Sequence, residues 1–83
     1  MTPLTTATHK LNGLRYRVSL LPLSKQELTE YPIKRLSEII DIFISRKRKT
    51  EKNQMDSLYE WFEDEFNTAS IDVIEILEKY EGK

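Results

Sequence analysis

The chain has 83 residues, of which 39% are hydrophobic and 33% charged, a composition typical of one small folded domain spanning residues 1–83. It contains no cysteine, one histidine and two glycines, which excludes disulfide scaffolds, thiolate or multi-histidine metal centres and glycine-rich phosphate loops. No apolar run approaches the roughly 20 residues that span a bilayer, and residues 1–6 do not resemble a secretory signal. We therefore expect a cytoplasmic protein without metal or other cofactor, with flexible ends at 1–4 and 82–83.

The net charge of −1 conceals two oppositely charged halves. Residues 1–50 carry ten lysines and arginines against four acids, whereas residues 51–83 carry ten acids against three lysines. Charge asymmetry of this kind favours interaction with a charged partner. The alternative interpretation is that the two halves face one another, or that their charges are solvated.

Residues 5–20 are predicted to form a β-hairpin, because Asn12 and Gly13 suit a type I′ turn in which both residues have positive φ. The side chains that this hairpin would direct inward are mostly apolar: Ala7, His9, Leu11, Leu14, Tyr16 and Val18. Such alternation is typical of antiparallel strands with one buried face. Lys10, Arg15 and Arg17 would share the outer face and form a candidate surface for nucleic-acid phosphates.

The rest of the chain is predicted to be helical, with helices at about 25–30, 32–48, 52–66 and 70–81. Ser24 suits an N-cap, Pro32 suits a first helical turn, and a break is expected at 67–70 with Ser70 as the next N-cap. The apolar spacing would also permit one helix over 33–66 that needs a dimer partner. The ten residues 45–54 carry no apolar side chain, which favours a turn near 49–52 instead. The expected fold class is α+β, a hairpin packed against three or four helices.

Trp61 lies among four carboxylates, those of Glu60, Glu63, Asp64 and Glu65. Helical spacing turns the indole away from the neighbouring apolar stripe, and an aromatic anchor with an acidic rim suits a basic protein partner. The competing interpretation is that Trp61 packs against another element. A densely acidic helix also suits nucleic-acid mimicry, as in small inhibitors of the phage type.

The densest basic run comprises Arg46, Lys47, Arg48 and Lys49. These cations could bind phosphates, and they would also complement the dipole at a helix C-terminus. No serine, histidine or carboxylate arrangement points to catalysis, so we expect no enzyme activity. The sequence favours a non-catalytic regulator or inhibitor that binds a basic protein through its acidic C-terminal helices. The alternative is a nucleic-acid-binding or antitoxin-like regulator that uses the hairpin and the basic run, and a homodimer is compatible with both.

Overall fold

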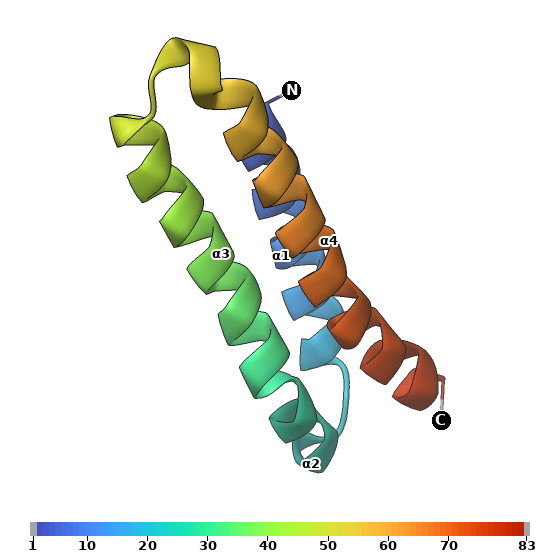
Figure 1. Cartoon of the computed structure of the whole chain (residues 1–83). Helices are drawn as coiled ribbons and strands as arrows, with labels where there is room; N and C mark the ends of the chain where they lie inside the picture. Colours follow the sequence, from blue (N-terminus) through green and yellow to red (C-terminus); the bar gives the residue numbers. More distant parts are fainter. Residues whose placement is uncertain (1, 83) are drawn as a thin grey trace.

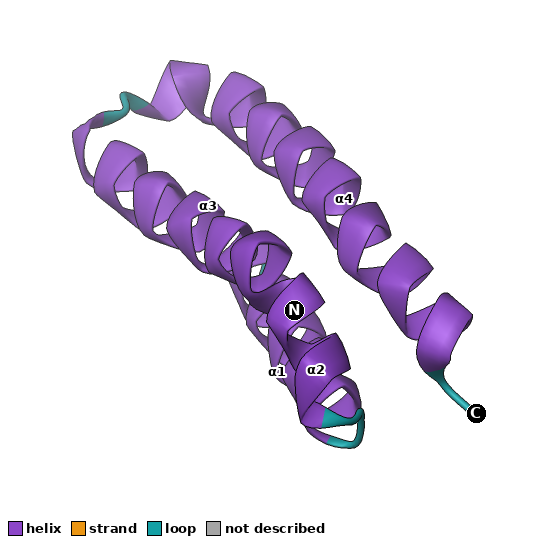
Figure 2. Cartoon of the chain, turned by 90° about the horizontal axis from the view of Figure 1, so that it is seen from below, coloured by secondary structure: helices purple, strands orange, loops and turns teal. Residues whose placement is uncertain are grey.

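A computed structural model describes residues 2–82, and these residues form three long helices and no strand (Figure 2). Helix α1 (Pro3–Ser19) is followed by an antiparallel helix α3 (Glu30–Lys49), and α4 (Met55–Tyr80) returns in the direction of α1 (Figure 1). The expected α+β class with an N-terminal hairpin is therefore wrong, because the protein is all-α over the described residues.

Two short connections join the long helices. Helix α2 (Leu23–Gln26) and the 3₁₀ turn η1 (Glu27–Thr29) lead directly into α3, close to the predicted short helix at 25–30. The N-cap of α2 is Pro22, so the prediction that Ser24 caps this helix is wrong. The predicted turn near 49–52 is confirmed, since Thr50 and Glu51 are extended before the 3₁₀ turn η2 (Lys52–Gln54) begins α4.

Helix α1 occupies the region predicted as a hairpin because its apolar residues also follow a helical period. The residues that pack into or against the core are spaced by three and four: Leu4, Ala7, Leu11, Leu14 and Val18. Thr2 caps the helix by accepting a hydrogen bond from the Thr5 amide, and Pro3 occupies the first turn, where no amide donor is needed. Asn12 and Gly13 lie exposed on the outer side of α1 without the positive φ that the turn required.

Helix α4 continues through the predicted break at 67–70, so the separate helices expected at 52–66 and 70–81 are one helix. Ser70 is fully buried, and its hydroxyl donates a hydrogen bond to the Phe66 carbonyl oxygen over 2.7 Å. The hydroxyl is therefore satisfied inside the helix and does not cap a new one. Ala69 and Ser70 continue the buried stripe from Phe66 to Val73, which keeps α4 against its neighbours.

The core lies along the line where the three helices meet, and aromatic rings join α3 to α4. Phe43 of α3 stacks on Phe62 of α4 with ring centroids 4.1 Å apart and an interplanar angle of 15°. Tyr59 and Phe66 pack obliquely on either side of this pair, each with a centroid separation of 5.7 Å. Phe43, Phe62 and Leu36 are among the fully buried side chains, so the α3–α4 contact forms the centre of the molecule.

The bundle is long and thin, measuring 48 × 19 × 16 Å. Its radius of gyration is 14.2 Å, compared with about 12 Å for a compact domain of this length. Pro3 and Leu4 belong to α1, whereas Met1 and Lys83, where flexible ends were expected, lie outside the described residues. Within residues 2–82, no helix combines the length and apolarity that crossing a bilayer requires.

The helical state of α1 predicts that Gly13→Ala stabilises the protein. A Cβ at Gly13 meets nothing within 4 Å, and alanine is better than glycine by about 0.5–1 kcal/mol inside a helix. We expect urea denaturation to give a higher free energy of unfolding by about that amount. A hairpin with positive φ at Gly13 would instead be destabilised by the same substitution, so a loss of stability would contradict the helix.

Candidate functional site

The outer side of α4 carries two pairs of carboxylates, Glu60 with Asp64 and Glu75 with Glu78, on either side of an exposed apolar residue. Around the helix, Glu60, Asp64, Glu75 and Glu78 lie within about 40° of Ile71, at about 100° per residue. All five side chains are exposed, including 52% of Ile71. We call these five residues the acidic face of α4. It extends for about 27 Å at 1.5 Å per residue.

The carboxylates of the acidic face are available to a partner. Helix α4 contains eight acids and a single lysine, Lys79. Among the described residues only one of these acids, Glu65, forms an ion pair. Within each pair the carboxylates repel one another, and the four acids give this side of the helix a formal charge of −4.

Trp61 lies at the seam between α3 and α4, not on the acidic face. Its ring is half-buried against the core, and the Arg46 guanidinium sits over it with Cζ 4.7 Å from the ring centroid. The Lys47 ammonium lies 5.9 Å from the ring centroids of Phe43 and Tyr59. The start of the basic run thus covers aromatic rings, and the predicted Trp61 anchor is partly enclosed by its own chain.

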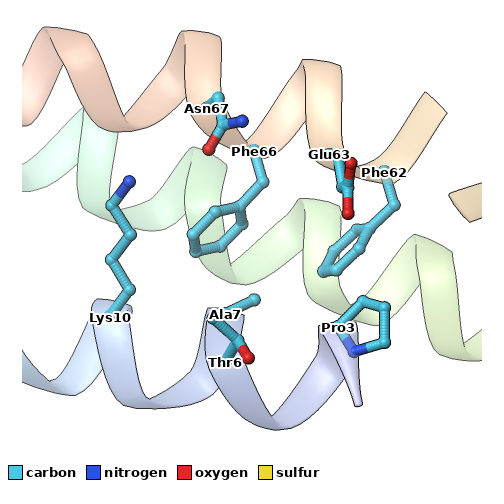
Figure 3. A pocket seen from close by; sticks show the side chains of 8 residues that line it. All are labelled: Pro3, Thr6, Ala7, Lys10, Phe62, Glu63, Phe66 and Asn67. Atoms are coloured by element: carbon cyan, nitrogen blue, oxygen red, sulfur yellow. The ribbon is translucent and has the colours of Figure 1, made fainter. Parts of the chain in front are cut away.

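The other predicted acids face different neighbours. Glu65 accepts a hydrogen bond from the Arg35 guanidinium of α3 over 3.3 Å. Glu63 turns toward α1 and lines a groove of about 430 Å³ between α1 and α4. Lys10 extends from α1 toward α4 beside Asn67, while phenylalanine rings of α4 point into the space between the helices (Figure 3). Of the predicted acidic cluster, only Glu60 and Asp64 therefore belong to the acidic face.

The predicted phosphate-binding surface of Lys10, Arg15 and Arg17 does not exist as one surface, because the hairpin that would align them is absent. On helix α1 Lys10 and Arg15 are separated by about 140°, at about 100° per residue. Arg17 is engaged by Glu81, with Nε donating to Oε2 over 2.9 Å and the second guanidinium nitrogen donating to Oε1. These hydrogen bonds hold the pKa of Glu81 below its ordinary value and raise that of Arg17.

The remaining basic residues predicted to bind nucleic acid lie together at the end of α3. Arg46, Lys47, Arg48 and Lys49 occupy its last turn and are all exposed. Arg48 and Lys49 contact no acid or aromatic ring among the described residues. Lys52 follows in η2 at the same end of the bundle. This end of the molecule is consequently the most basic part of the surface.

No group of three or more histidine, cysteine or acidic side chains within residues 2–82 could hold a metal ion. Comparison of the chain with protein-family models, curated proteins and solved structures gives no match.

Sequence reasoning missed Ile71, Glu75 and Glu78 as members of the acidic face. The predicted break at 67–70 separated them from Glu60 and Asp64. The signal that could have joined them is the unbroken stripe of Phe62, Phe66, Ala69, Val73 and Leu77, which has spacings of three and four. A single helix through this stripe places all five residues of the acidic face on the opposite side.

The guanidinium above Trp61 predicts that Arg46→Ala exposes the indole. We expect acrylamide to quench tryptophan fluorescence more strongly in this variant, because the ring loses its polar cover. Trp61 is the only tryptophan, so the signal comes from one site. Lys49→Ala removes a charge from the same helix end without touching the ring, and equal quenching in both variants would refute the stacked arrangement.

Proposed function

We propose that this chain is a non-catalytic interaction protein of regulator or inhibitor type, and that the acidic face of α4 binds a basic partner protein. The observation that carries the proposal is a face about 27 Å long with four exposed carboxylates, none ion-paired to a described residue, around an exposed isoleucine. A partner helix or loop that presents lysines and arginines around one apolar side chain would match this pattern. The cytoplasmic location expected from the composition remains part of the proposal.

The chemistry of the surface supports binding over catalysis. Exposed carboxylates in high dielectric bind cations and accelerate association, but each contributes little affinity. Burial of Ile71 in the centre would supply the apolar contact that such interfaces require. The same row of negative charges also suits mimicry of a nucleic-acid backbone, which would direct the protein to the basic groove of a nucleic-acid-binding protein.

Neutralising the acidic face should weaken binding to a basic probe. The test variant replaces its four acids by amides: Glu60→Gln, Asp64→Asn, Glu75→Gln and Glu78→Gln. The probe is a fluorescein-labelled amphipathic peptide rich in lysine and arginine with one central leucine, titrated by fluorescence anisotropy. We expect the dissociation constant to rise at least about tenfold, and to rise for the wild type as salt increases.

A matched control variant separates location from total charge. It neutralises four exposed acids outside α4, namely Glu27→Gln, Glu30→Gln, Glu38→Gln and Asp41→Asn, which changes the net charge equally. We expect this control to bind the peptide nearly as well as the wild type. Equal weakening in both variants would show that only overall charge matters, and the assignment to α4 would be withdrawn.

A second candidate function rests on the basic end of α3. Arg48 and Lys49 are exposed there without an acidic partner among the described residues, and Lys52 adds a further cation. The alternative of a nucleic-acid-binding or antitoxin-like regulator therefore depends on residues 46–49 and no longer on α1. Cations at a helix C-terminus already complement the helix dipole, which makes this the weaker proposal.

Nucleic-acid binding by the basic run predicts a steep salt dependence. Labelled duplex DNA, single-stranded DNA and RNA should each be titrated at 50 and 200 mM salt. Four phosphate contacts would raise the dissociation constant by roughly a hundredfold between these conditions. Arg48→Gln combined with Lys49→Gln should reduce this dependence. Absence of binding at 50 mM salt would exclude nucleic-acid binding by the basic run.

A further inference from the structure

Large apolar side chains are exposed at the end of the bundle where α1 connects to α3. Leu20, Leu23, Leu28 and Tyr31 are each between 48% and 79% exposed. They lie within twelve consecutive residues around α2, at one end of the long axis (Figure 1). We call these four residues the apolar end. Tyr16, one helical turn before Leu20 on α1, is a further exposed aromatic residue. Clustered apolar exposure of this kind marks an interaction surface.

The charges around the apolar end are balanced. Lys25 and Lys34 are accompanied by Glu27 and Glu30, and none of these four side chains forms an ion pair with a described residue. A strongly basic or acidic partner would find no complementary potential here. A second copy of the chain does fit, because a two-fold contact places the same patch of both copies face to face. The lysines of one copy can then lie opposite the glutamates of the other.

The charge of the whole protein also permits self-association. The net charge is −1, so two copies repel each other weakly at neutral pH. The acidic face of α4 differs from the apolar end in its chemistry, because it carries four carboxylates around one isoleucine. We propose that the chain forms a two-fold symmetric homodimer through the apolar end.

The dimensions of the bundle determine how two copies meet. A standard interface buries about 800 Å² on each partner, which is about one-seventh of the 5885 Å² surface of this chain. The cross-section of 19 × 16 Å is too small to supply this area from a tip-to-tip contact. The two copies therefore overlap side by side near their ends, so that the contact also includes an exposed side chain on the flank of a long helix, Tyr16 of α1 or Tyr31 of α3. The dimer is consequently shorter than two bundle lengths placed end to end.

The test is the oligomeric state of the full chain in solution. Sedimentation equilibrium from about 5 to about 500 µM should show a monomer–dimer equilibrium, because mass action favours the dimer as concentration rises. The equilibrium should persist from 0.15 M to 1 M salt, since an apolar contact is not screened. Leu23→Glu and Tyr31→Glu should each raise the dissociation constant of the dimer at least about tenfold. Both side chains are exposed, so neither substitution removes a core contact.

Ile71→Glu is the matched control, because it introduces the same charge at an exposed apolar residue on the other surface. This variant should dimerise like the wild type. A monomer at every concentration overturns the proposal, as does equal weakening by Ile71→Glu and Leu23→Glu. Dissociation at 1 M salt also overturns it, because that result assigns the contact to the opposite charges of α4 and the end of α3.

Discussion

The stack of Phe43 on Phe62 is the contact on which the rest of the structure depends. Both rings are fully buried and join α3 to α4 in the half of the bundle nearer the turn at residues 50–51. Each of these helices has one apolar stripe, so the stack also sets the rotation of each helix about its own axis. A rotation by one residue, about 100°, would turn charged side chains of α4 inward, and an unpaired buried charge costs several kcal/mol.

This rotation explains why the acidic face exists. The apolar side chains of α4 are used against α3 and α1, and the carboxylates are left on the solvent side of the helix. Like charges at spacings of three and four weaken an isolated helix by a few tenths of a kcal/mol per pair. Burial of residues such as Phe62, Val73 and Leu77 offsets that cost. The fold thus maintains a row of unpaired charges that α4 would not favour alone.

The acidic face and the apolar end lie on different parts of the surface and have different chemistry. The first is strongly charged with a single apolar residue, whereas the second is apolar with balanced charges. A homodimer that leaves the acidic faces outside its contact would present two binding surfaces in one assembly. A partner with two basic segments would then bind with a higher effective affinity than either face provides.

Local signals in the sequence predicted two features correctly, whereas the turn signal of Asn12 and Gly13 and the N-cap signals of Ser24 and Ser70 were wrong. Pro32 was correctly placed in a first helical turn, and the apolar gap of residues 45–54 correctly predicted the turn before α4. The first helix was mispredicted because Ala7, Leu11, Leu14 and Val18 fit an alternating strand and a helical stripe equally well. His9 and Tyr16 separate the two patterns, since a strand would bury both side chains and the helix leaves both exposed.

The candidate site was predicted only in part, because local sequence patterns do not show which side of a helix becomes buried. The sequence revealed the acidic excess after residue 50. It did not reveal the contact between Arg46 and Trp61, because these residues lie on either side of a turn and meet only when α3 packs against α4. Ser70 is a residue type that favours an N-cap, but in the bundle it is buried and its hydroxyl donates a hydrogen bond to the Phe66 carbonyl oxygen within α4.

The sequence by itself determined the turn before α4 and the separation of charge, because these depend on residue type and on neighbours within a few positions. The tertiary structure decided the state of α1, the continuity of α4 and which carboxylates share a face. Those outcomes depend on which side of each segment another helix buries, and burial is a property of the assembled bundle.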